Sequence, residues 1–249
     1  MGAGDLEIWL NHFEQHARHP RCVPRGLSDV LRSDERELIA SSIATFQLGE
    51  QSEGRTLLRA AERFAREKQV PHLLRIIELL IREEQRHAAL LRAFMQGHQV
   101  PLKRTDWTDR IFRRIRRLAG LQLYVSVLIC AELIGNVYYR ALESVTDCER
   151  LRVLCRNIVS DELAHVGFES QLLFTLRAGR AARWRVLTRH AHRIFFEITA
   201  AVVWSTHRSV LRSAGHSGQS FLRSCRAQYV FYLEPTGVLN SRESLSHKW

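Results

Sequence analysis

The stretch "LIREEQRHAALL" (residues 80–91) places charged residues where a buried helix face should be apolar. Apolar residues recur in steps of three and four on both sides of it, which is the spacing of one face of a helix. Glu84 and His87 fall on this same stripe. The stripe consists of Leu73, Ile77, Leu80, Glu84, His87, Leu91 and Phe94. Burying a carboxylate or an imidazole alone is costly, so both side chains should meet a partner in the core.

A second pair with the same spacing occurs in "DELAH" (161–165), where Glu162 and His165 continue the apolar stripe of another predicted helix. Of the 12 histidines, only His87 and His165 stand three residues after a glutamate. One such pair is a weak signal, because chance alone produces it in a chain of this length. Two pairs on buried stripes indicate a shared chemistry.

Each pair is preceded by one further glutamate on an apolar stripe. Glu50 precedes Glu84 by 34 residues, and Glu132 precedes Glu162 by 30. These separations suit antiparallel helices whose midpoints face each other. The order is therefore Glu, Glu-x-x-His, Glu, Glu-x-x-His, with one element on each helix. This order is typical of bundles that bind two metal ions through carboxylates.

The charge of these side chains predicts their partner. Four carboxylates are costly to desolvate together, and two divalent cations would neutralise them. Oxygen and nitrogen donors fit iron or manganese, and the absence of cysteine from the pattern argues against a sulfur-bound centre.

Residues 34–178 resemble the ferritin-like superfamily of di-iron carboxylate proteins, and specifically its O₂-activating oxygenase and oxidase branch. "EEQRH" and "DELAH" are similar to the [DE]-E-x-R-H signature of that branch, although Ala164 replaces the arginine. A histidine found in arylamine N-oxygenases is replaced by Ile158, so no subfamily is assigned. The resemblance implies two Fe ions, with Mn or mixed Mn/Fe as alternatives. The implied metal ligands are Glu50, Glu84, His87, Glu132, Glu162 and His165, of which Glu84 and Glu162 would bridge and Glu50 and Glu132 would be terminal.

Three further acids are candidates for contacts around the ligands. Glu83 and Asp161 directly precede the two motif glutamates, and each could bind the ring N–H of a ligating histidine. Glu53 lies one turn after Glu50 and could support it or act as an extra ligand. Ordinary polar positions at the edge of the stripe remain the alternative for Glu83 and Asp161, and an acid that faces a groove is the alternative for Glu53.

The chain is predicted to be all-α, with a ferritin-like four-helix bundle and additional helices at both ends. We expect a single domain over residues 1–249, with its core at 34–178, an N-terminal helix and loop at 1–33, and C-terminal helices and tail at 180–249. The expected helices cover about 5–18, 34–68, 71–97, 107–145, 146–179, 181–213 and 220–232, with capping boxes at Asp34 and Thr146.

The composition of the chain limits its possible binding partners and its cellular compartment. The net charge is +11, and a basic solvated surface is the favoured interpretation over an RNA, acidic-protein or anionic-lipid partner. The five cysteines show no C-x-x-C motif and no secretory signal is visible, so we expect a cytoplasmic protein. The apolar runs Leu118–Ala131 and Ile194–Trp204 are shorter than a spanning helix, so no membrane span is expected.

These features favour a non-haem di-iron oxygenase or oxidase, a monooxygenase-type enzyme that uses O₂ to hydroxylate, N-oxygenate or desaturate a small organic substrate. No catalytic residue is expected beyond the metal centre. Electrons would come from an external reductase or ferredoxin, because no flavin or Fe–S motif is present, and the chain could form a homodimer. The alternatives are an iron-handling ferroxidase or peroxide scavenger, and a tRNA-modifying di-iron hydroxylase.

Overall fold

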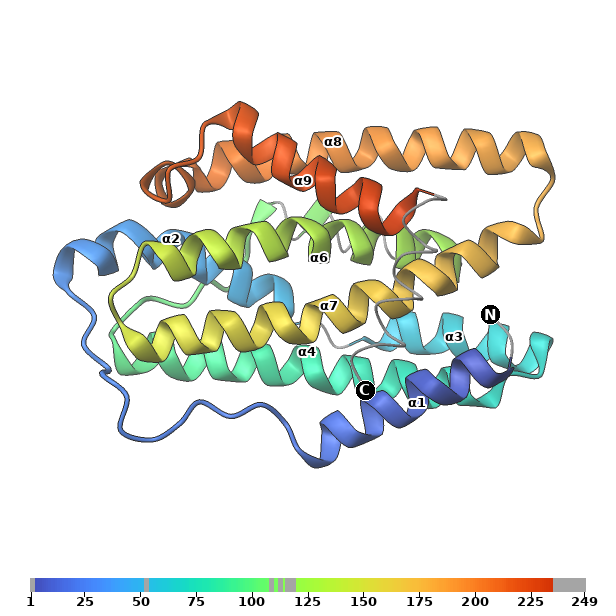
Figure 1. Cartoon of the computed structure of the whole chain (residues 1–249), viewed down its shortest axis with the longest axis horizontal. Helices are drawn as coiled ribbons and strands as arrows, with labels where there is room; N and C mark the ends of the chain where they lie inside the picture. Colours follow the sequence, from blue (N-terminus) through green and yellow to red (C-terminus); the bar gives the residue numbers. More distant parts are fainter. Residues whose placement is uncertain (1–2, 52–53, 108–109, 112–113, 115–119, 235–249) are drawn as a thin grey trace. The chain divides into compact units, whose positions relative to one another are not determined.

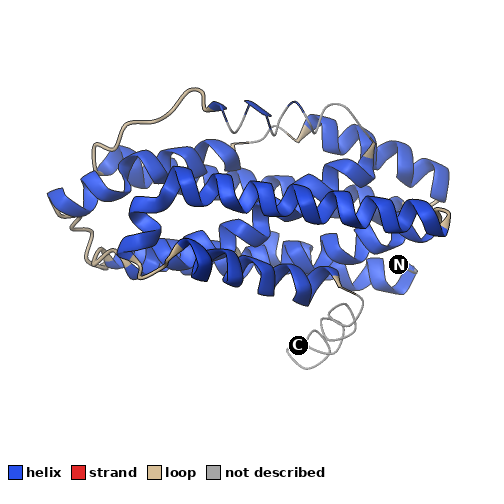
Figure 2. Cartoon of the chain, turned by 90° about the horizontal axis from the view of Figure 1, so that it is seen from above, coloured by secondary structure: helices blue, strands red, loops and turns tan. Residues whose placement is uncertain are grey.

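The computed structural model describes residues 3–51, 54–107, 110–111, 114 and 120–234. All regular secondary structure in these residues is helical, which confirms the all-α prediction (Figure 2). The chain divides into two compact units, and both contain discontinuous segments. Unit 1 comprises Met1–Tyr124 and Thr146–Ile158, and unit 2 comprises Val125–Val145 and Val159–Trp249. The ferritin-like topology and the single domain stay predictions.

Unit 1 is organised around the long helix α4 (Pro71–Gly97), which packs against three others. These are α1 (Ala3–Arg18), α2 (Ser33–Glu50) and α3 (Arg55–Lys68). Figure 1 shows α1, in dark blue, lying along α4. All the apolar members of the stripe predicted for α4 are buried. Pro71 occupies the first turn of α4, where its fixed φ suits a helix start and its missing N–H is not needed.

The expected helix over residues 34–68 is interrupted directly after Glu50. Gly54 has φ of +62°, and a Cβ atom built on it would lie 2.5 Å from Cδ1 of Ile81 on α4. The chain therefore passes so close to α4 that only glycine fits, and one helix becomes two. The expected capping box at Asp34 is wrong: the N-cap is Arg32, which makes no side-chain cap but pairs with Asp34.

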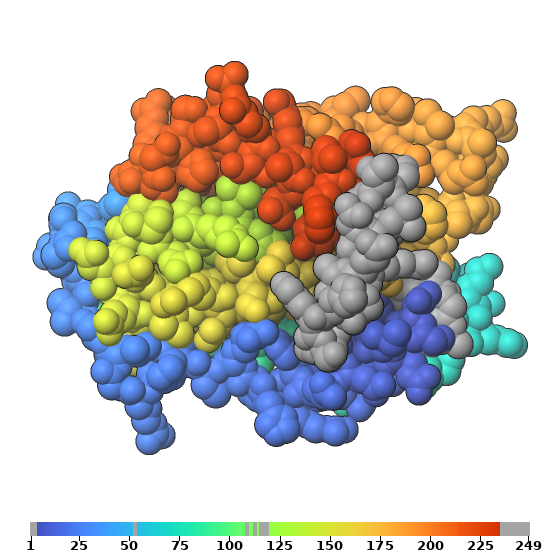
Figure 3. Space-filling view, viewed as in Figure 1, coloured from blue at the N-terminus to red at the C-terminus, as the bar shows by residue number. Residues whose placement is uncertain are grey.

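Unit 2 contains most of α6 (Leu121–Ser144) and α7 (Glu149–Ala178), whose first parts belong to unit 1. It also contains α8 (Ala182–Ser213) and α9 (Gly218–Leu233), which pack against each other and form one orange-to-red surface in Figure 3. α6 starts after Gly120, so the expected continuous helix over 107–145 is wrong at that residue. Residues 108–109, 112–113 and 115–119 lie outside the described part.

Helix α6 is long and apolar enough to cross a membrane by length and composition alone. It is longer than the apolar run Leu118–Ala131 considered from the sequence. However, 78% of its most apolar window is buried inside the protein, as in the core helix of a soluble protein. The absence of a membrane span stays a prediction.

Candidate metal centre

The first group of possible metal ligands lies in unit 1, and we call it the unit 1 triad: Glu50, Glu84 and His87. Glu50 is the last residue of α2, while Glu84 and His87 are one turn apart on α4. One ligand atom from each of the three side chains lies within 4.8 Å of the others. The Nδ1 atom of His87 is 3.9 Å from Oε1 of Glu84. His87 is fully buried, whereas both glutamates are half-buried.

The second group lies in unit 2, and we call it the unit 2 triad: Glu132, Glu162 and His165. Glu132 comes from α6, and Glu162 and His165 come from α7. Their ligand atoms also lie within 4.8 Å of one another. The Nδ1 atom of His165 is 3.4 Å from Oε2 of Glu162 and 4.0 Å from Oε1 of Glu132. All three side chains are buried, as the apolar stripes predict.

The residues of each triad fit a divalent cation. Two carboxylates and one neutral imidazole carry a charge of −2, so one divalent ion makes the group neutral. Metal–oxygen and metal–nitrogen bonds of about 2.0–2.2 Å bring the ligand atoms of one ion to separations comparable with those observed. Neither triad includes a thiolate, which is consistent with iron or manganese. The buried Glu and His groups could therefore hold metal ions. That all six residues share one dinuclear centre stays a prediction.

Glu83, the acid before Glu84, is held by groups other than the predicted ligands. Its Oε1 lies 2.9 Å from Nδ1 of His16 on α1 and accepts a hydrogen bond of 2.7 Å from Nη2 of Arg86. The contact with His16 cannot be predicted from the sequence, because it depends on how α1 packs against α4. The Glu83 carboxylate thus ties α1 to the helix that carries half of the unit 1 triad.

Asp161 and Glu53 are the other two acids that were predicted to lie near the ligands. Asp161 is 1% exposed, so it is a core carboxylate rather than a polar edge residue. Glu53 lies outside the described residues. The support of a metal-bound imidazole by Glu83 or Asp161 stays a prediction.

Asn136 is a buried polar residue that was not among the site residues predicted from the sequence. It lies one turn after Glu132 on α6 and is 1% exposed. Neither its amide nitrogen nor its amide oxygen has a hydrogen-bond partner among the described residues. A buried amide without partners costs about 1–3 kcal/mol, so it marks a place where water, an ion or a ligand is expected. The available signal was its position four residues after Glu132.

A third group of potential ligands, also in unit 1, has a different character. Asp29, His98 and Cys148 lie close together, but Asp29 is exposed. Its carboxylate already contacts Nε2 of His98 at 2.8 Å and Nη1 of Arg150 at 3.2 Å. Burial raises the pKa of the Cys148 thiol, which disfavours the thiolate that a metal requires. This group is better described as an ion pair beside a buried thiol.

Comparisons with protein-family models, curated proteins and solved structures gave no match to this chain. The class that the structure defines is an all-α protein with buried carboxylate and histidine groups able to hold a metal ion.

Proposed function

We propose that this chain is a non-haem di-iron oxygenase or oxidase whose two triads together hold a dinuclear centre. The observation that carries the proposal is the repetition of the triad. Each unit contains one Glu–Glu–His group. In each group a long helix supplies one glutamate and one histidine at Glu-x-x-His spacing, and an earlier helix supplies the other glutamate. Two ions of charge +2 balance the four carboxylates. If the two Glu-x-x-His pairs had arisen by chance, we would not expect a further glutamate to lie within 4.8 Å of each.

The roles of the chain's own residues follow from their chemistry. Glu50 and Glu132 would each bind one ion, and Glu84 and Glu162 would bridge. The imidazoles of His87 and His165 complete the ligand set. Bound iron supplies the redox chemistry that protein side chains lack, namely the activation of O₂.

The surroundings of the unit 2 triad would protect that chemistry. Leu133 and Ile134 follow Glu132 on α6 and are fully buried, so this part of the helix is shielded from water. Asn136 offers an amide donor and an amide acceptor to a polar group bound one turn from Glu132. It is a positioning residue under this proposal.

The substrate class and partners belong to the same proposal. O₂ and a small organic molecule would be the substrates, and a separate reductase or ferredoxin would deliver electrons. A homodimer is the proposed assembly. Manganese, alone or with iron, would fit the same oxygen and nitrogen donors.

The experiment that tests the proposal combines metal analysis with rapid kinetics. The full chain is loaded with Fe(II) without oxygen, its iron is counted, and it is mixed with O₂ in a stopped-flow spectrophotometer. We expect two irons per chain and a transient visible absorption band. A folded chain that binds no iron or manganese although all six ligands are intact would contradict the proposal.

Solution mass separates the proposal from an iron-handling function. A monomer or dimer is expected, whereas a 24-subunit shell would identify a storage protein. The net charge of +11 also counts against an acidic storage cavity. RNA that binds with a steep salt dependence would instead favour the tRNA-modifying alternative.

A further inference from the structure

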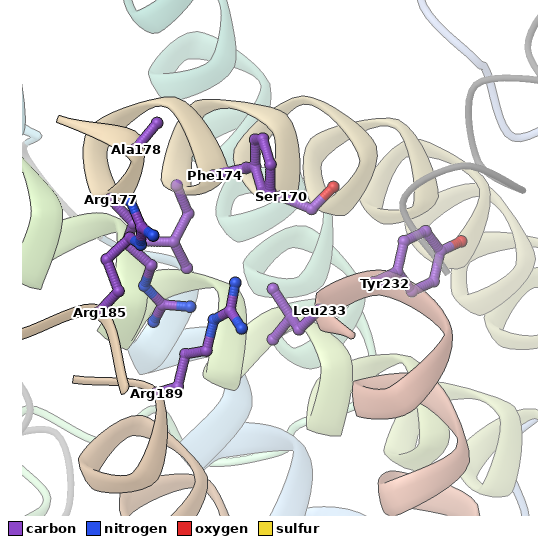
Figure 4. A pocket seen from close by; sticks show the side chains of 9 residues that line it. Ser170, Phe174, Arg177, Ala178, Arg185, Arg189, Tyr232 and Leu233 are labelled. Carbon is purple, nitrogen blue, oxygen red and sulfur yellow. The ribbon is translucent and has the colours of Figure 1, made fainter. Parts of the chain in front are cut away.

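A pocket of about 300 Å³ lies within unit 2, among α7, α8 and α9. Three arginines line it: Arg177 at the end of α7, and Arg185 and Arg189 on α8. Figure 4 shows their side chains gathered on one side, with Tyr232 on the opposite side. Apolar side chains, including Leu173, Phe174 and Leu233, supply most of the remaining wall. The pocket therefore combines concentrated positive charge with an apolar surface.

Arg177 is the most unusual of the three because it is only 7% exposed. Its Nη2 donates a hydrogen bond of 2.9 Å to Nδ1 of His192 on α8. Its Nε has no hydrogen-bond partner among the described residues. Burial lowers the pKa of Arg177, and the positive charge of Arg189 lowers it further. Burying a guanidinium in this way is expensive unless an anion accompanies it.

The side chain that Arg177 contacts is neutral, and the buried Glu169, which acts on the same Cys130 thiol, forms no ion pair with Arg177. Burial lowers the pKa of His192 to about 4, so its imidazole is uncharged near neutral pH. Because Nδ1 accepts from Arg177, Nε2 carries the proton and donates to the carbonyl oxygen of Ser126 at 2.8 Å. Burial also raises the pKa of the Cys130 thiol and raises that of Tyr229 to about 12. His192 orients Arg177 without balancing its charge.

Two arginines outside the pocket, one on α8 and one on α9, are paired with acids. Arg193 lies 3.2 Å from both Glu197 and Glu234, and Arg226 lies 2.9 Å from Glu197. In contrast, none of the described acids forms an ion pair with Arg177, Arg185 or Arg189. The three arginines that line the pocket are therefore not paired with any described acid.

We propose that this pocket binds a small organic acid. Its carboxylate would contact the three guanidinium groups, and its apolar body would lie against Leu173, Phe174 and Leu233. Guanidinium groups suit carboxylates because they can donate two parallel hydrogen bonds. The volume is at the lower end for ligand pockets, which limits the ligand to the size of a single ring or a short chain.

The pocket is separate from the predicted metal ligands. Arg177 follows His165 by 12 residues on the same helix, which corresponds to about 18 Å of rise. The nearest lining residue, Ser170, follows His165 by five residues, or about 8 Å of rise, so the arginines lie at the end of the pocket away from the triad. The inference therefore does not rest on the proposed function, and a failure of either one leaves the other standing.

Benzoate is a suitable probe, because it joins a carboxylate to one apolar ring. We would titrate it into the full chain by isothermal titration calorimetry, with neutral benzamide and inorganic phosphate as comparisons. We expect saturable benzoate binding and no comparable benzamide binding. Arg185→Gln and Arg189→Gln should each weaken benzoate binding by about tenfold or more, as expected for a lost charge-assisted hydrogen bond.

Arg183→Gln is the matched control, since it removes the same charge from an exposed position on α8 outside the pocket. It should leave benzoate affinity unchanged. The buried Arg177 is a poorer test position, because its replacement can disturb folding. The proposal is overturned if benzoate does not bind, if benzamide binds equally well, if only phosphate binds, or if all three arginine variants behave alike.

Discussion

The Nδ1 atom of His165 on α7 lies 4.0 Å from Oε1 of Glu132 on α6. The two residues are 33 positions apart in the chain, and each faces the buried side of its helix. The contact joins a lone glutamate to the Glu-x-x-His motif that follows it. The metal-binding role of the unit 2 triad can therefore be tested by replacing one ligand at a time.

Replacement of a triad histidine or glutamate should remove the metal. His87→Ala and Glu162→Ala are expected to lower the iron content from two per chain to nearly none, because ions in a shared centre depend on each other's ligands. Helical content, measured by circular dichroism, should stay close to that of the parent chain.

Glu78→Gln is the control for this experiment. It removes a carboxylate from α4 that pairs with Arg75 near the surface. This variant should keep both irons. If His87→Ala or Glu162→Ala retained a single tightly bound iron, each triad would bind its ion alone and a shared centre would be wrong.

Asn136→Leu should stabilise the metal-free chain while impairing its reaction with O₂. Leucine has the same branching and the same number of heavy atoms as asparagine and removes a buried amide without partners among the described residues, so the free energy of unfolding should rise by about 1 kcal/mol. Iron content should be unchanged, and O₂ consumption by the reduced protein should slow by about tenfold if the amide positions a bound group. Denaturant unfolding and an oxygen electrode provide the two measurements.

Asn157→Leu offers a comparison on α7, where the Asn157 amide donates to the carbonyl oxygen of Cys22 at 3.3 Å. Loss of that hydrogen bond should not stabilise the chain. An Asn136→Leu variant that is less stable than the parent would show that the amide has a partner in the native protein.

Gly54→Ala should destabilise unit 1. Alanine is strained at φ of +62°, and its Cβ would collide with the side chain of Ile81. Together these effects should lower the free energy of unfolding by about 2–4 kcal/mol in a denaturant titration.

Gly49→Ala provides the control five residues earlier. Gly49 is exposed on α2, and an added Cβ would meet nothing within 4 Å. This substitution should be neutral or stabilising by up to about 1 kcal/mol, because alanine favours a helix. Equal effects at the two glycines would show that the approach to Ile81 does not constrain the chain.

His192 should make the stability of the protein fall in mild acid. The pKa of His192 is about 4 in the folded chain and 6.5 in the unfolded chain. Between these pH values the unfolded state therefore binds one more proton than the folded state. The contribution is present above pH 6.5 and is lost as the pH falls toward 4. Between pH 7.5 and 5.0 it should amount to about 2 kcal/mol.

His192→Gln should remove that part of the pH dependence in urea unfolding, because the amide can still accept from Arg177 but cannot titrate. His190→Gln changes an exposed histidine on the same helix and should keep the slope of the parent chain. A parent and a His192→Gln variant with identical slopes would mean that folding does not lower the pKa of His192.

The sequence by itself determined the helical class, most helix bounds and the buried carboxylate–histidine groups. The sequence indicated four of these residues, because a charged or polar residue on an apolar stripe is unusual: Glu84, His87, Glu162 and His165. The helix period that defines the stripe can be recognised without any tertiary contact. Start and stop residues were also local: Pro71 begins α4, and Gly179 follows α7.

Only the tertiary structure decided the features that depend on which helices approach each other. The break after Glu50 exists because Gly54 passes against Ile81, and the contact between His16 and Glu83 requires α1 to lie on α4. Arg177 looks like an ordinary basic residue at a helix end until α8 places the neutral His192 beside it. Local patterns record which side of a helix is buried, whereas the partner that buries it is set by long-range packing.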